Sequence, residues 1–149
     1  MAETPGRLKV VHIFGAMDVG GAELRSLELL REMGPHNYEF HFVTLSGRPG
    51  IMASEIESLG GIVRPVKLDW RFPIRFAFFL IRERPLALDS HVATFSGALC
   101  FLAALCNVPV RIAHFHSDGD GHTDSLRRRM QRSLMTLLIR AFSTRVVGV

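Results

Sequence analysis

The stretch that decides the fold is LKVVHIFGAMDVGGAE, Leu8–Glu23. Its first half, Leu8–Phe14, is an apolar run that only Lys9 and His12 interrupt, which predicts a strand buried on both faces. Three glycines follow, and an amphipathic helical pattern opens at Ala22. A strand, a glycine loop and a helix start together indicate a doubly wound α/β domain, in which ligands bind outside the carboxyl ends of the strands.

The glycine loop is similar to two nucleotide-binding motifs and matches neither. The dinucleotide fingerprint G-x-G-x-x-G does not fit glycines at positions 15, 20 and 21, so NAD binding is disfavoured. Gly15 and Gly20 have the P-loop spacing, but Gly21 and Ala22 replace its lysine and hydroxyl residue, which excludes a P-loop ATPase. A plain turn between strand and helix stays an alternative to a ligand-binding loop.

Size and composition favour one globular domain with an anionic partner. The 149 residues are 48% hydrophobic, and the net charge of +4 with a pI near 9.8 favours phosphates, nucleic acid or acidic lipid. No stretch is apolar over the roughly 18 residues of a membrane span, and the N-terminus lacks a secretory signal. Cys100 and Cys106 lie on different sides of one helical stretch, so we expect reduced thiols in a cytoplasmic protein.

Strands and helices alternate along the rest of the chain, which predicts a mostly parallel sheet covered on both faces. We expect Asp124 or Thr123 to cap the last helix. The final apolar strand lacks a closing helix, and we expect a second domain to follow it in the parent protein. The predicted strands are Leu8–Phe14, Tyr38–Ser46, Ile62–Val66, Leu86–Ser90, Pro109–His116 and Thr144–Val149, and the predicted helices are Gly21–Met33, Ile51–Leu59, Phe72–Arg84, Ser96–Cys106 and Asp124–Phe142.

Four short motifs in this order resemble the N-terminal half of retaining GT-B glycosyltransferases of the family-4 (group 1) class. They are Gly20–Glu23 after the first strand, Ser90-His91 after the fourth, Val110–His114 in the fifth and the terminal Val147–Val149. The resemblance covers nearly the whole chain and implies a single Rossmann-like, three-layer domain over residues 1–149 that holds the acceptor. The C-terminal domain, which binds the nucleotide-sugar donor in that family, is absent, so the resemblance implies that the isolated chain is inactive.

One segment departs from the family pattern. Relatives often show Asp-Val-Val-His-x-His around the fourth strand, whereas this chain reads Leu86–His91, LALDSH. Asp89 therefore stands where a histidine is more common, which changes the expected acceptor pocket.

The resemblance assigns roles to residues at the strand ends. Gly20 and Gly21 would let backbone N–H groups approach the donor diphosphate. His114 would contact the donor sugar near the reacting carbon, without acting as a general base, and His91 would bind an acceptor hydroxyl. The alternatives are a satisfied core histidine at position 114 and a histidine that bonds the backbone at position 91.

The segment HFHSDGDGHTD, residues 114–124, is the most polar in the chain. We expect Asp118 and Asp120 to bind acceptor hydroxyls, with a solvated loop as the alternative. An EF-hand does not fit the spacing, but His114, His116 and Asp118, completed by His91, could form the zinc site of a metal-dependent hydrolase. We expect no metal and no cofactor, since the nucleotide-sugar is a substrate.

Two basic helices complete the candidate surfaces. The predicted helix Phe72–Arg84 is rich in phenylalanine and arginine. This composition is typical of a helix that lies on an anionic membrane, here at its inner face, or of a core helix with a basic rim. Arg127–Arg129 and Arg132 could hold phosphate, with a solvated helix face as the alternative. We expect a sugar or lipid-linked acceptor and no nucleic acid, and a non-catalytic membrane- or partner-binding module is the remaining alternative. The arginines expected at a membrane or anion are Arg71, Arg75, Arg82 and Arg84.

Overall fold

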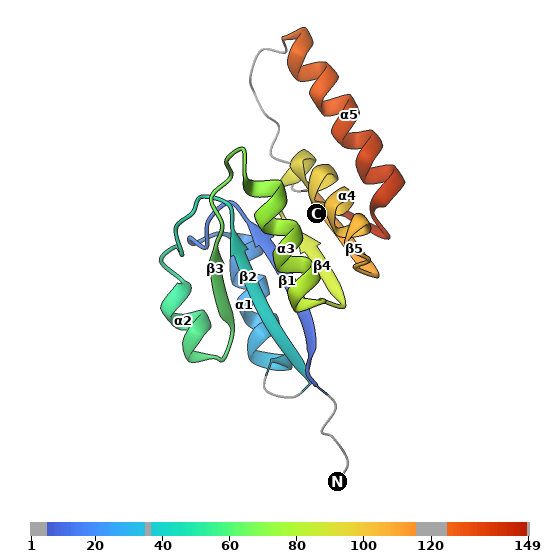
Figure 1. The fold of residues 1–149 in the computed structure, drawn as a ribbon. Helices are drawn as coiled ribbons and strands as arrows, with labels where there is room; N and C mark the ends of the chain where they lie inside the picture. Colours follow the sequence, from blue (N-terminus) through green and yellow to red (C-terminus); the bar gives the residue numbers. More distant parts are fainter. Residues whose placement is uncertain (1–5, 35–36, 116–124, 149) are drawn as a thin grey trace.

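The computed structural model describes residues 6–34, 37–115 and 125–148 and shows a sheet between two layers of helices (Figure 1). All six strands run parallel, in the order β3-β2-β1-β4-β5-β6. The strands are β1 (Leu8–Phe14), β2 (Tyr38–Thr44), β3 (Ile62–Pro65), β4 (Ala87–Ser90), β5 (Val110–Phe115) and β6 (Arg145–Gly148). The helices are α1 (Gly21–Met33), α2 (Ala53–Ser58), α3 (Phe72–Glu83), α4 (Ser96–Leu105) and α5 (Leu126–Phe142), with a short 3₁₀ helix, η1 (Ala93–Phe95).

The period-two alternation of β1 and β2 builds two cores, one on each face of the sheet. Val11 and Ile13 of β1 pack with buried side chains of α3 and α4, and Phe14 of β1 packs with Phe40 and Phe42 of β2 and with α1 and α2. Figure 1 shows α1 behind the sheet and α3 in front of it. A smaller third core joins α4, β5 and α5.

The strand order reverses direction between β1 and β4, which are neighbours in the sheet although two strands separate them in sequence. Loops that follow two such strands leave the sheet toward opposite faces, so a crevice forms at their carboxyl ends. This switch point places the residues after β1 and those after β4 side by side.

The structure confirms the predicted doubly wound parallel sheet, and the bounds of β1 and α1 agree with the prediction. Each of the other predicted elements is one or two residues longer than the observed element at one or both ends. The predicted cap of α5 was wrong: Ser125 is the N-cap, and its hydroxyl accepts a bond from the Arg128 amide. The sequence reading also missed η1, which forms directly after β4.

Two further sequence expectations concern membrane spans and thiols. Within the described ranges, each helix is too short or too polar to cross a membrane. Cys100 and Cys106 are both free thiols, as expected. Burial raises the pKa of the Cys100 thiol to about 11, so it acts as a small apolar side chain.

Candidate functional site

Parallel register brings polar side chains of three strands to one face of the sheet at its carboxyl edge. His12 of β1 is in register with Asp89 of β4, and the His91 amide donates to the Ile13 carbonyl at 2.9 Å, which extends the pairing one residue beyond β4. His114 of β5 lies one strand further along. Side chains two residues apart on a strand share a face, so these residues converge.

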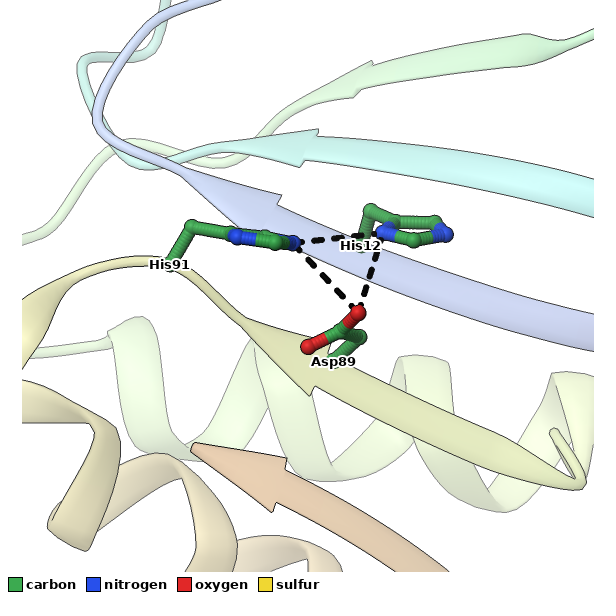
Figure 2. Close-up of side chains that lie close together, drawn as sticks. All are labelled: His12, Asp89 and His91. Atoms are coloured by element: carbon green, nitrogen blue, oxygen red, sulfur yellow. Dashed lines mark hydrogen bonds and ion pairs between the residues drawn. The ribbon is translucent and has the colours of Figure 1, made fainter. Parts of the chain in front are cut away.

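The four side chains form one cluster around the Asp89 carboxylate. Its Oδ1 lies 3.0 Å from His114 Nε2, and its Oδ2 lies 3.6 Å from His12 Nδ1 and 3.5 Å from His91 Nε2. His12 Nδ1 and His91 Nε2 are 3.4 Å apart. Figure 2 shows the two imidazoles meeting edge to edge above the carboxylate. The two oxygens of Asp89 therefore serve different histidines.

The histidine rings of the cluster stack on neighbouring aromatic rings. The His91 ring stacks on Phe14 with centroids 4.4 Å apart and an interplanar angle of 2°, and the His114 ring lies 4.5 Å from His91 on a 32° tilt. His12 stacks on Phe40 and Phe42 at 5.6 and 5.5 Å. This packing fixes the ring planes without consuming their nitrogens.

Burial sets the charges in the cluster. The His12 side chain is 3% exposed, and its burial lowers the pKa of His12 to about 4, so the imidazole is neutral at pH 7. Burial works against ionisation of Asp89 as well, but the contact with His91 and the charges of His12, His91 and His114 hold the pKa of Asp89 below its ordinary value. The site at neutral pH thus contains an ionised carboxylate close to the neutral His12 ring.

A buried hydroxyl pair ties this edge to the next helix. The Ser90 and Ser96 hydroxyls are 2.8 Å apart, and both residues are fully buried. Because Ser90 lies between Asp89 and His91, the bond fixes the end of β4 against the start of α4. The Asp89 and His91 side chains on either side of Ser90 therefore project from a segment that is bonded to α4.

The start of α1 offers backbone donors at the same switch point. Gly20 is the N-cap with extended backbone, and no side chain of the cap bonds the first turn. The N–H groups of Gly21, Ala22 and Glu23 precede the first helical bond, which runs from the Leu24 amide to the Gly20 carbonyl at 3.0 Å. The loop before them begins at Gly15, next to the Phe14 ring that stacks on His91.

Of the residues predicted for the site, the structure brings His91 and His114 together through Asp89. Asp118, Asp120 and His116 lie outside the described residues, so their predicted acceptor or metal roles stay predictions. The sequence reading missed His12 and the central position of Asp89. A polar residue in a strand buried on both faces was the available signal, because such a group needs a partner inside the fold.

The predicted basic helix α3 has a buried face and an exposed apolar face. Phe72, Phe76 and Leu80 are buried, whereas Ile74, Phe78 and Ile81 are 58%, 69% and 57% exposed. The exposed side chains and Leu102 of α4 line an apolar groove.

The four arginines near α3 have different environments. Arg75 donates to the Asp69 carboxylate and to the Lys67 carbonyl, and Arg71 lies over the Trp70 ring. The Arg82 side chain is 87% exposed, and Arg84 caps the end of α3 in a left-handed conformation.

Comparisons with known proteins show the family of this chain. Residues 20–148 match the family described as glycosyl transferase 4-like domain. The chain is 31% identical over 144 residues to the capsular polysaccharide biosynthesis glycosyltransferase CapH of Staphylococcus aureus, covering 95% of this chain and 40% of that protein. It is 30% identical over 142 residues to EpsF of Bacillus subtilis (strain 168), which also carries a glycosyltransferase name, covering 91% of this chain and 37% of EpsF. The chain thus spans about two fifths of the length of these curated relatives. The family model covers most of the chain, and the chain belongs to the glycosyl transferase 4-like domain family.

Proposed function

We propose that this domain is the acceptor-binding half of an enzyme that transfers a sugar from a nucleotide-sugar donor. The observation that carries the proposal is the meeting of His91, His114 and the start of the α1 loop at the β1/β4 switch point. Its relatives bear glycosyltransferase names and are more than twice as long as the matched region. A second, donor-binding domain is therefore part of the proposal, and the isolated chain is expected not to transfer sugar.

In this proposal His114 contacts the donor sugar and His91 binds an acceptor hydroxyl. His114 Nε2 lies 3.0 Å from Asp89 Oδ1, so the carboxylate stands beside the imidazole that is proposed to contact the donor. The first-turn N–H groups at Gly20 and Gly21 face the donor diphosphate, because a helix N-terminus favours negative charge. Asp118 and Asp120 stay candidates for the acceptor, and the transfer step itself is proposed to need no metal.

Mutation of the two histidines in the protein that contains both domains tests this function. We expect His114→Ala to lower kcat roughly 10²-fold, as loss of one preorganised contact to a reacting group does, and His91→Ala to raise the KM for the acceptor. His41→Gln is the control, because His41 lies on β2 in a different cluster, bonded to Glu39. Release of nucleotide from the sugar donor is the readout. Unchanged kinetics in both site variants, with folding intact, would remove these two roles.

The acceptor is proposed to be attached to a lipid, with α3 resting on an anionic membrane surface. The exposed apolar side chains Ile74, Phe78 and Ile81 support this, with the exposed Arg82 beside them. Co-sedimentation with vesicles of phosphatidylglycerol and phosphatidylcholine at low salt tests it. We expect Phe78→Asp with Arg82→Glu to abolish binding and Leu24→Asp, a change of an exposed leucine on α1, to leave it intact. Equal sedimentation of all three proteins would contradict membrane contact.

A further inference from the structure

The three atoms that Figure 2 joins by dashed lines are too far apart for good hydrogen bonds and too close to be unrelated. Their separations are 3.4 Å between His12 Nδ1 and His91 Nε2, 3.6 Å between His12 Nδ1 and Asp89 Oδ2, and 3.5 Å between His91 Nε2 and Asp89 Oδ2. Hydrogen bonds that involve N–H groups are usually about 2.7–3.2 Å long. Three convergent polar atoms inside the fold therefore share a small space without a strong bond among them.

The triangle has the size of a metal site. Its edges average about 3.5 Å, so its centre lies ~2.0 Å from each corner (the edge divided by the square root of three), which is the usual distance from zinc to histidine nitrogen or carboxylate oxygen. We propose that His12, Asp89 and His91 bind one zinc ion that joins the carboxyl ends of β1 and β4.

The donor atoms suit this ion. Two imidazole nitrogens and one carboxylate oxygen are a common set for zinc with an open fourth position. The His114 Nε2 atom at 3.0 Å from the second Asp89 oxygen would orient the carboxylate, as outer partners of metal ligands commonly do.

A second group of histidine and carboxylate side chains on the sheet is a weaker candidate for zinc. Glu39, His41 and Glu83 are also close enough together to share an ion. There, however, Lys9 Nζ lies 2.6 Å from Glu83, and Arg64 Nε donates to His41 Nδ1 at 3.1 Å. Those cations already occupy the donor atoms. Among the described residues, the ion-pair partners of Asp89 are histidines and include no lysine or arginine.

The inference goes beyond the proposed transfer and shares His91 with it, because an ion on His91 Nε2 leaves that nitrogen unavailable to an acceptor hydroxyl. The ion would act as a clamp between strands that are 77 positions apart at His12 and Asp89, and it takes no part in moving the sugar. Zinc titration of the isolated chain and nucleotide release by the two-domain protein are separate readouts, so either proposal can fail while the other is confirmed.

The test is zinc titration of the purified, tag-free chain after removal of metal with a chelator. We expect the wild type to bind one zinc ion per chain by calorimetry and to gain thermal stability with excess zinc. His12→Phe keeps the aromatic stack on Phe40 and Phe42 and removes a ligand, and Asp89→Asn removes the charge. Both should weaken zinc binding at least ten-fold, whereas His41→Phe, in the second cluster, should bind as the wild type does.

Two results would overturn the proposal. One is a wild type that binds no stoichiometric zinc. The other is a wild type that binds zinc with an affinity that His12→Phe and Asp89→Asn leave unchanged, since the ion would then sit elsewhere, for example on the histidines of residues 116–124. Circular dichroism identifies a variant that fails to fold. If His12→Phe does not fold, zinc binding by Asp89→Asn tests the proposal, because this substitution changes the fewest packing contacts. Absorption of the cobalt(II)-substituted protein gives an independent readout of the ligand set.

Discussion

Replacement of Gly21 by alanine should leave the fold intact and damage only ligand binding. Gly21 is the first residue of α1, and a Cβ built there meets no atom within 4 Å. Alanine is the better helix former by roughly 0.5–1 kcal/mol in a helix interior, and less at a terminus. We therefore expect the free energy of unfolding to change by less than about 1 kcal/mol, in the stabilising direction. Gly20→Ala should instead be slightly destabilising, because Gly20 is the N-cap of α1, where glycine is preferred to alanine, and a Cβ there would lie 2.3 Å from the flexible Glu23 carboxylate.

The same methyl group would stand where the donor diphosphate is proposed to approach the backbone. In the protein that contains the donor domain, we expect the KM for the nucleotide-sugar to rise about ten-fold, which corresponds to ~1.4 kcal/mol. Thermal unfolding measures the change in stability of Gly21→Ala, and steady-state kinetics measure its KM for the nucleotide-sugar.

Gly50→Ala is the control, because its backbone is left-handed with φ +84° and its Cβ would lie 2.4 Å from the Met17 carbonyl oxygen. It should lose at least ~1–3 kcal/mol of stability from backbone strain alone. An unchanged KM in a stable Gly21→Ala protein would refute the donor role of this loop. Destabilisation of Gly21→Ala by more than the control would refute the structural argument.

Three further predictions concern parts of the fold outside the site. Phe76 is a fully buried residue of α3, so Phe76→Ala should cost about 3–5 kcal/mol in urea unfolding, and a loss below 1 kcal/mol would contradict the packing described. The Lys9 ammonium holds the pKa of Glu83 below its ordinary 4.5. The contribution of this pair to the free energy of unfolding is therefore full above pH 4.5 and is lost as the pH falls through the lower pKa of the folded state. In Glu83→Gln, the stability should fall less steeply with decreasing pH than in the wild type. Thiol reagents should modify Cys106 of the folded protein before the fully buried Cys100, and the opposite order would show that α4 opens.

The sheet was predictable because its signals are local. Glycine and proline bound nearly every apolar run, and β1 and α1 have the predicted limits to the residue. The error at the start of α5 is local too: Thr123, Asp124 and Ser125 are adjacent, each can cap a helix, and the sequence does not rank them. Strand ends were predicted a residue or two long because apolar side chains continue past the last paired position, as Leu45 does after β2.

The cluster at the switch point was harder to predict because it depends on the strand order. His12 and Asp89 become neighbours only once β4 pairs with β1, and local patterns do not specify that pairing. The resemblance to a family suggested His91 and His114, while Asp89 stood out only as a departure from the pattern. In the structure, the departing residue occupies the centre, between all three histidines.

The position of Asp89 connects the two proposals. Its Oδ1 faces His114, which is proposed to contact the donor sugar, and its Oδ2 faces the proposed zinc ligands His12 and His91, of which His91 is also proposed to bind the acceptor. Loss of its charge should therefore weaken both functions, whereas His12→Phe removes a zinc ligand and leaves the contact with His114 in place. If His12→Phe abolishes zinc binding and retains transfer, the ion serves the architecture of the switch point. If it abolishes both, the zinc-bound form of Asp89 is the one that orients His114, and the clamp is a precondition of the chemistry.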